Sequence, residues 1–315
     1  MDLANTNIEI RERSLSQRVD LALRFVATRA WGVGLYAAMG VIPALAFNAL
    51  LVWSLDPFQT WNALDWQVPW VLIMYLTWVE SPLVMAPLVV FLGAALFRQP
   101  MTWRAALGDV AKKMISQIYV HGIVRCHLFW VALVLLAYAN QSEVAFYSLV
   151  VFGVLFGSVF WFLRPYVDHI MYLERLPLLL KKEHPMTVGQ RSSILHSADS
   201  GETMLESFIN VLLSVIVFYT TYSFCLWAYY WVTFNTVSQD WFAVSIFAVA
   251  WWNAMVVATV LRFLGYLDAR IRSEGWELDL RVRREAEQQA AHGVGQTRGA
   301  GSPTRAADRS LGDVA

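Results

Sequence analysis

Charged residues are scarce in this chain of 315 residues: they make up 15% of it, whereas hydrophobic residues make up 57%. A typical soluble domain carries about 25% charged residues. Because burying charge in hydrocarbon is costly, this deficit is typical of a protein embedded in a bilayer. The net charge is zero, so the chain lacks the basic excess of nucleic-acid-binding proteins, and we predict no nucleic-acid partner.

Cysteines and the common catalytic motifs are also missing or few. The chain has two cysteines, Cys126 and Cys225, which provide neither a disulfide framework nor a Cys-x-x-Cys metal motif. It contains no His-Glu-x-x-His zinc motif, no glycine-rich phosphate loop and no Gly-x-Ser-x-Gly nucleophile motif. The sequence therefore predicts a protein that is not an enzyme and that uses no metal or cofactor.

Lysine and arginine are absent from three of the segments that separate the apolar runs. Of the 24 basic residues, five precede the first run, five lie between the second and third, five lie between the fourth and fifth, and nine lie from Arg262 onward. Basic residues mark the cytoplasmic side of membrane proteins. We therefore expect both termini in the cytoplasm, a location in the cell membrane, and contact between the basic face and anionic lipid headgroups.

Six apolar runs have the length of about 20 residues that a membrane-spanning helix needs. The runs are continuous rather than alternating, which favours helices over a barrel. The predicted fold is therefore an all-α polytopic membrane protein. Its expected parts are an amphipathic segment 1–30, a membrane domain 31–264, a charged cytoplasmic helix 265–289 and a disordered tail 290–315, with spans at about 31–53, 70–97, 118–139, 144–163, 207–231 and 242–264.

An internal repeat runs through the basic segments. Similar stretches begin at Arg13, Met101 and Met186, and each carries a serine or threonine suited to cap a helix. The exits of the fourth and sixth runs also match, with Tyr166, Asp168 and Glu174 aligned to Tyr266, Asp268 and Glu274. The pattern predicts three units of an amphipathic helix followed by a two-span hairpin. The first such helix either lies in the membrane interface or packs on its neighbours.

The run Tyr266-Leu-Asp-Ala-Arg-Ile-Arg-Ser-Glu-Gly-Trp-Glu-Leu resembles the C-terminal signature of a bacterial family of uncharacterised multi-span membrane proteins. Those proteins are similar to the membrane domain attached to some glycerophosphodiester phosphodiesterases. Ser273 replaces the arginine that is usual there, and Glu277 replaces the usual aspartate. The resemblance implies a bacterial inner-membrane protein, and no hydrolase activity because this sequence contains no soluble phosphodiesterase domain.

Glu80 is the strongest candidate for a functional residue. It follows Trp70 by ten residues, which places it about 15 Å along a helix and near the middle of the membrane. An ionisable group there costs at least ~2.5 kcal/mol and is a functional candidate by default. Pro82 and Pro87 predict a kink beside it, as in the broken helices of transporters. The alternative is a structural glutamic acid that is protonated, hydrogen-bonded or paired with Arg125.

A second polar cluster opens the third apolar run. The spacing of His121 and Arg125 puts them on one helix face, whereas His127 is expected to point elsewhere. A metal site would require His121, Cys126, His127 and Glu80 to converge from two helices. We instead predict that these side chains reach toward the inner face of the membrane.

Two further motifs favour a structural interpretation. Asp168 and His169 are adjacent, so on a helix they do not face each other, and Asp168 is expected to pair with Arg164. Gly153 and Gly157 form a GxxxG motif, which allows two helices to approach closely. In a chain with six spans, we expect that contact to be within the chain rather than between chains.

The sequence thus predicts a non-enzymatic envelope scaffold or assembly component. In this hypothesis the charged helix 265–289 is displayed to a protein partner. The alternative is a transporter or lipid-handling protein that uses Glu80 beside Pro82 and Pro87.

Overall fold

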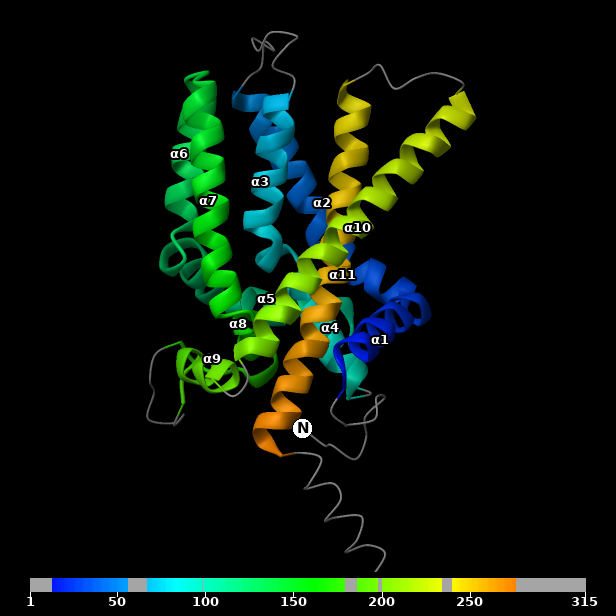
Figure 1. Ribbon diagram of the computed structural model, residues 1–315, viewed down its shortest axis with the longest axis vertical. Coiled ribbons are helices and arrows are strands. Elements are labelled where there is room, and N and C mark those ends of the chain that lie inside the picture. Colours follow the sequence, from blue (N-terminus) through cyan, green and yellow to red (C-terminus); the bar gives the residue numbers. More distant parts are fainter. Residues whose placement is uncertain are drawn as a thin grey trace, which may run out of the picture. The chain divides into compact units, whose positions relative to one another are not determined.

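The computed structural model describes residues 13–55, 67–97, 99–178, 186–197, 200–233 and 240–275. The described residues are helical and contain no strand, so the predicted all-α class is confirmed (Figure 1). The helices are α1 Leu15–Thr28, α2 Ala30–Leu55, α3 Gln67–Val84, α4 Ala86–Leu96, α5 Trp103–Gln117, η2 Ile118–Val124, α6 His127–Ala139, α7 Glu143–Leu163, α8 Val167–His169, η3 Ile170–Glu174, α9 Val188–Ser197, α10 Ser200–Thr233 and α11 Asp240–Glu274. Both η segments are π-helices. Met1–Ser273 forms one compact unit and Glu274–Ala315 a second, of which Glu274 and Gly275 are described.

The described residues contain five helices that are long and apolar enough to cross a membrane. These are Ala30–Ser54, Val71–Leu96, Glu143–Leu163, Gly201–Thr233 and Ser245–Glu274. A bent pair, Trp103–Val124 and His127–Ala139, would be the sixth, and its two parts meet at 66°. The predicted third span is therefore interrupted. In Figure 1, α6 and α7 run side by side as a hairpin and α2 lies beside α3.

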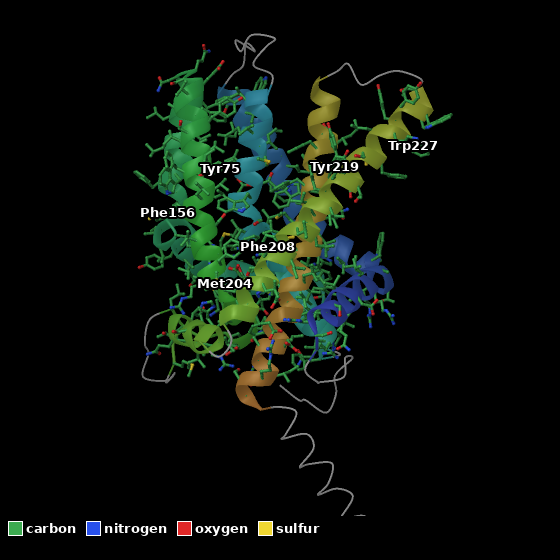
Figure 2. All side chains as sticks on the ribbon, in the orientation of Figure 1. Tyr75, Phe156, Met204, Phe208, Tyr219 and Trp227 are labelled. Carbon is green, nitrogen blue, oxygen red and sulfur yellow. The ribbon has the colours of Figure 1, made fainter. Side chains whose placement is uncertain are left out.

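Large apolar side chains cover the outer surface of several of these helices. In Figure 2, Trp227 points away from the neighbouring helices, whereas Tyr75 lies between α3 and α7. Trp227 is 58% exposed and Tyr75 is 1% exposed. A soluble protein rarely exposes so much contiguous apolar surface. This distribution is the one expected where hydrocarbon rather than water surrounds the helices.

Two large apolar clusters, and a smaller one around Ala86 and Val89, form the interior of the first unit. The largest joins α4, η3 and α11 around fully buried side chains such as Leu88, Met171 and Phe263. The second joins α3, α6 and α7 around Leu72 and Phe146. Together they hold the broken helices α3–α4 and η2–α6 within one packed body.

The GxxxG motif lies on the face of α7 that packs against α3. A Cβ atom added at Gly153 would lie 2.7 Å from the Tyr75 hydroxyl, and one at Gly157 would lie 2.3 Å from the Trp78 ring. Only glycine fits so close to those rings. The motif therefore serves a contact within the chain, as the sequence predicts.

The repeated serine and threonine residues do begin helices. The Thr102 hydroxyl accepts from the Ala105 amide at 3.3 Å at the start of α5, and the Thr187 hydroxyl accepts from the Gln190 amide at 3.3 Å at the start of α9. The Ser14 amide donates to the Gln17 side chain at the start of α1. Ala22 on α1 is fully buried, so this helix packs on its neighbours.

Candidate functional site

The helix that carries Glu80 is interrupted just beyond it. Pro82 has no amide hydrogen, so the Trp78 carbonyl loses its helical donor, and the Ser81 hydroxyl donates to that carbonyl instead at 2.9 Å. α3 ends at Val84, and α4 begins at Ala86 with Pro87 in its first turn, where a missing amide hydrogen costs nothing. The predicted proline break is thus present, and it is stabilised by a local hydrogen bond.

The predicted third span is interrupted at the same level. After α5, the chain runs as the π-helix η2 through Ile118–Val124, and Cys126 then takes the left-handed conformation with φ of 56° before α6 starts. A left-handed residue other than glycine is uncommon. Strained backbone and π-helical turns occur often at functional sites. Next to this break, His121 of η2 and His127 of α6 are buried, and the His127 ring packs against Trp78 of α3.

A pocket lies between the two broken helices. Its volume is about 130 Å³, and its walls come from the end of α3, the η2 segment and the start of α6. Its lining residues are Val79, Glu80, Leu83, Gln117, Ile118, His121, Gly122, His127 and Leu128. Ile118 and Leu128 are 43% and 54% exposed on the apolar outer surface. The pocket therefore has an apolar rim on the lipid-facing side and a polar inner end.

Three of the four predicted site residues line this pocket. Glu80, His121 and His127 meet there, whereas Arg125 is not among the lining residues. His127 does not point elsewhere as the sequence predicts: its ring lies 6.4 Å from the ring of His121, between centroids. The suggested Glu80–Arg125 pair does not form either, because Arg125 binds the Arg164 carbonyl at 3.0 Å and the His121 ring at 3.3 Å.

Two of the polar lining residues are already fully engaged. The Gln117 amide donates to the Pro82 carbonyl at 2.6 Å, and its carbonyl accepts from the Tyr172 hydroxyl. His121 Nδ1 faces the Arg125 guanidinium, which can only donate, so His121 Nδ1 accepts. His121 Nε2 then carries the proton and donates to Asp168 at 2.6 Å. Gln117 and His121 hold the wall of the pocket and offer no free nitrogen or oxygen to it.

The other two polar lining residues are Glu80 and His127. Glu80 Oε2 accepts from the Asn48 amide of α2 at 3.2 Å, and Glu80 Oε1 has no partner among the described residues. His127 is 7% exposed, and within the described structure neither of its ring nitrogens has a hydrogen-bond partner. Leaving a buried polar group unsatisfied costs about 1–3 kcal/mol. These two side chains are therefore the groups that a ligand in the pocket would meet.

Asp168 and His169 lie behind the pocket wall. Burial raises the pKa of Asp168, but the neighbouring His121 and Arg125 together lower it by a larger amount. The pKa of Asp168 is therefore well below its ordinary value. Burial lowers the pKa of His169 to about 4. The negative charge of Asp168 opposes this shift, and the positive charge of Arg262 adds to it. The expected Asp168–Arg164 pair is wrong, since Asp168 binds His121 from another element.

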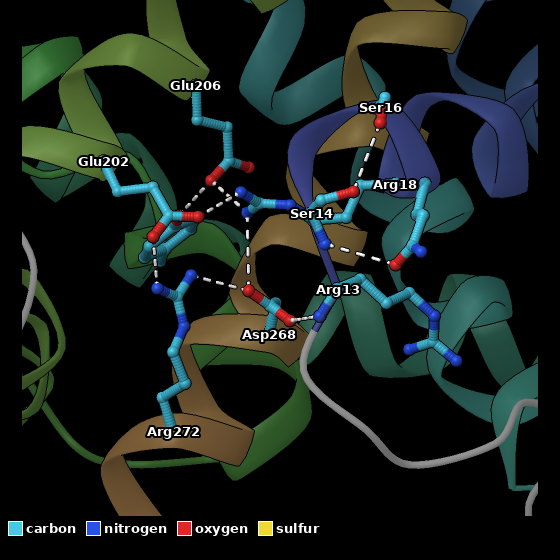
Figure 3. Close-up of polar contacts among 10 residues, drawn as sticks. Arg13, Ser14, Ser16, Arg18, Glu202, Glu206, Asp268 and Arg272 are labelled. Carbon is cyan, nitrogen blue, oxygen red and sulfur yellow. Dashed lines mark hydrogen bonds and ion pairs between the residues drawn. The ribbon is translucent and has the colours of Figure 1, made fainter.

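The basic end of the first unit contains a second buried polar cluster, which we call the Arg18 network (Figure 3). Arg18 of α1 donates to Glu206 at 2.8 Å and to Glu202 at 2.6 Å, both on α10. Arg272 of α11 donates to Asp268 at 2.6 Å and also bonds Glu202. Arg18 is 2% exposed, so its charge is compensated by carboxylates rather than by water.

The repeated exit motifs pack against each other beside this network. The rings of Tyr166 and Tyr266 are 6.1 Å apart between centroids. The Tyr166 hydroxyl donates to Glu206 at 3.1 Å, and the Tyr266 hydroxyl donates to Glu174 at 2.7 Å. Burial, reinforced by Glu206, raises the pKa of the Tyr166 hydroxyl. Each tyrosine of the repeat thus binds a glutamate from another element, and Glu174 is part of the repeated motif whereas Glu206 is not.

Within the described residues, no group of three His, Cys, Asp or Glu side chains could hold a metal ion. No family model, curated protein or solved structure matches this chain. Among the residues that shape the site, sequence reasoning missed Asn48 and Gln117. An amide inside an apolar run is the signal that points to Asn48, whereas nothing in the sequence places Gln117 beside Pro82.

Proposed function

We propose that this protein binds an amphiphilic molecule from the membrane in the pocket beside Glu80 and moves or presents it, as a transporter or lipid-handling protein. One observation carries the proposal: the proline-containing span Val71–Leu96 and the bent pair Trp103–Val124 and His127–Ala139 meet at a pocket. The polar end of that pocket leaves Glu80 and His127 available. Interrupted helices around a buried polar site are typical of secondary transporters. An intramembrane carboxyl group without a structural ion pair is by default functional.

The position of the pocket supports an amphiphile over a water-soluble solute. The rim residues Ile118 and Leu128 are exposed on the apolar surface, and their neighbours Ile123 and Phe129 are both 59% exposed. A chain of methylene groups would lie against such a surface, with each buried methylene contributing about 0.8 kcal/mol. The inner end supplies the few oriented polar groups that give a binding site its specificity.

Transport in reconstituted liposomes tests this proposal. Wild-type protein should accelerate the movement of fluorescent single-chain amphiphiles between leaflets, and Glu80→Gln should abolish the acceleration at equal protein density. Asp20→Asn is the matched control, because it also removes one carboxylate but lies 60% exposed on α1. If wild type neither moves nor binds any amphiphile in a panel of amine, hydroxyl, phosphate and carboxylate headgroups, the proposal is wrong.

The scaffold hypothesis receives less support. The first part of the predicted helix 265–289 is the end of α11, where Tyr266, Asp268 and Ile271 are buried among neighbouring helices. That part is not displayed to a partner, and residues 276–289 lie outside the described residues. The remaining hypothesis is that residues 276–289 bind a protein partner. Comparing the proteins that co-purify from native membranes with the full chain and with a 276–289 deletion tests it.

We further propose that the end of the first unit that holds the Arg18 network faces the cytoplasm of a bacterial cell, since basic residues mark that side. The family resemblance of the Tyr266 motif supports the same location. Anionic headgroups are proposed to meet this face. Fewer basic side chains are available to headgroups than the number of lysines and arginines suggests, because Arg18, Arg191 and Arg272 already bind carboxylates. A reporter fused at Gly189 should report the cytoplasmic side.

A further inference from the structure

We infer that the pocket selects amphiphiles whose headgroup donates hydrogen bonds, such as a primary amine or a hydroxyl. It excludes carboxylate and phosphate headgroups. The selected amphiphiles enter from the leaflet on the side of the Arg18 network. This inference rests on the proposed function and specifies its ligand. It is carried by the two side chains that remain available in the pocket, Glu80 and His127, and by the level at which they lie.

Glu80 makes the inner end of the pocket a hydrogen-bond acceptor. Glu80 ionises when an ammonium binds beside it, and as a carboxylate it only accepts. Asn48 already donates to its Oε2 oxygen. The Oε1 oxygen therefore calls for a donor, which an ammonium or a hydroxyl supplies. A carboxylate or phosphate headgroup would place a second negative charge beside Glu80 in a medium of low dielectric constant, where like charges repel strongly.

His127 accommodates the same headgroups. A neutral imidazole offers one donor and one acceptor, and within the described structure both nitrogens lack partners. A hydroxyl satisfies both side chains at once by donating to Glu80 and accepting from His127. An ammonium does so by donating to Glu80 and to the acceptor nitrogen of His127. Trp78, whose ring lies 5.5 Å from His127 between centroids, packs against the imidazole and limits its reorientation.

No cation in the pocket offsets the negative charge of Glu80. Arg125, two residues before His127, is 4% exposed and directs its guanidinium to His121 and to the Arg164 carbonyl. His121 is engaged at both nitrogens, and its partner Asp168 adds a further negative charge behind the wall. The ionisable groups around the pocket therefore favour a donor headgroup over an anion.

The level of the pocket identifies the leaflet. A Cβ atom at Gly157 of α7 would lie 3.0 Å from His127 Nε2. Gly157 precedes the end of α7 at Leu163 by six residues, which is about 9 Å along a helix. That end leads into α8 and η3, which pack on the Arg18 network through Tyr166. The pocket is thus offset toward this face from the middle of the membrane, where the sequence count places Glu80.

Photo-crosslinking with three matched probes tests the inference. Diazirine probes with the same twelve-carbon chain and an amine, hydroxyl or carboxylate head would be irradiated with the protein in nanodiscs, and labelled peptides mapped by mass spectrometry. The amine and hydroxyl probes should label peptides containing Ile118 or Leu128 at least about tenfold more than the carboxylate probe, which corresponds to ~1.4 kcal/mol of selectivity. An excess of unlabelled dodecylamine should compete this labelling away.

Two variants assign the selectivity to named groups. Glu80→Gln should lower amine labelling by about tenfold while hydroxyl labelling changes by about twofold or less, because only the charge is lost. His127→Phe should lower both, since the ring keeps its shape but loses its nitrogens. Asp20→Asn should change neither. The melting temperature of each variant, measured in the same nanodiscs, identifies any variant that fails to fold.

The outcomes separate the inference from the proposed function. Pocket labelling that is strongest with the carboxylate probe, or a donor preference that survives both Glu80→Gln and His127→Phe, overturns the headgroup assignment but leaves an amphiphile site in place. Labelling that is absent from the pocket with every probe overturns the proposed function together with the inference. Labelling by donor probes that depends on Glu80 and His127 supports both.

Discussion

The first unit contains two buried polar clusters that are built in opposite ways. In the Arg18 network, each charged group meets an opposite charge, and Arg18 bonds both Glu202 and Glu206. In the pocket, Glu80 keeps an oxygen without a described partner, and both nitrogens of His127 are unsatisfied within the described structure. The first cluster joins continuous helices α1, α10 and α11, whereas the second lies at two helix breaks.

This difference assigns different roles to two buried clusters of polar side chains. A charge-paired network resists change, because removing one partner leaves an uncompensated buried charge. An unsaturated site costs stability that the fold must supply from elsewhere, and such sites are retained where a ligand completes them. Changes in the Arg18 network should therefore affect folding, and changes in the pocket should affect binding.

The largest expected effect is on stability and comes from Arg18→Met. Methionine retains an apolar side chain but leaves Glu206 without its buried cation, while Glu202 and Asp268 keep Arg272. This should lower the free energy of unfolding by about 3–5 kcal/mol. Arg24→Met on the same helix removes an exposed pair with Asp20 and should cost less than about 0.5 kcal/mol. Unfolding in mixed detergent and SDS micelles, followed by circular dichroism, measures both. Equal losses of unfolding free energy in the two variants would show that the Arg18 network contributes no more to stability than an exposed ion pair does.

His169 lies between the two clusters and should make stability depend on pH. It is 3% exposed, its ring stacks on Tyr266, and its pKa is about 4, against about 6.5 in an unfolded chain. Between these values the unfolded chain binds the extra proton, so stability is greatest above pH 6.5 and falls as the pH drops toward 4. The loss should total roughly 3 kcal/mol at 1.36 kcal/mol per pKa unit.

His169→Phe is the test of that pH dependence. The variant should lose this contribution to the fall in unfolding free energy between pH 7 and pH 4, while the contributions of other titrating groups persist. The measurement is the same SDS titration, repeated at half-unit pH steps. An unchanged profile would mean that His169 is not buried as a neutral ring.

The parts of the fold that depend on local composition were predictable. Apolar runs locate the membrane helices because hydropathy is a local property, and Pro82 predicts the break at Met85 because proline removes a helical donor. The break at Cys126 was not predictable, since nothing in the residues around it marks a left-handed cysteine. For that reason the prediction that His127 points away from His121 was wrong. A straight helix would separate the two rings, whereas the π-helical turn of η2 brings them close together.

The pairing of charges was less predictable than their position. The count of basic residues identifies one face of the membrane domain, but the sequence pairs Asp168 with Arg164, whereas the structure pairs it with His121. An i,i+4 spacing gives an interaction of only about 0.2–0.5 kcal/mol. A partner from another helix easily outweighs so small a preference, so the sequence indicates which groups are buried and tertiary packing decides their partners.

A smaller loss of stability should follow from Gly265→Ala, which crowds the Arg18 network without changing its charges. The new Cβ atom would lie 1.5 Å from a Glu206 carboxylate oxygen. Because Arg18 and Tyr166 hold that carboxylate, it cannot move freely, and we expect a loss of about 1–3 kcal/mol. Gly34→Ala is the control, since no atom lies within 4 Å of its new Cβ. The control should be neutral or stabilise α2 by up to about 1 kcal/mol.

The smallest effect on stability is expected at the residue that matters most for binding. Glu80→Gln retains the size of the side chain, and the new amide oxygen can still accept from Asn48 at the 3.2 Å site that Glu80 Oε2 occupies. The added amide hydrogens face the pocket rather than a described acceptor. The unfolding free energy should therefore change by less than about 1 kcal/mol, while labelling by the amine probe falls about tenfold. A loss of about 3 kcal/mol or more would instead show that Glu80 stabilises the fold. Both clusters would then have a structural role, despite their different geometry.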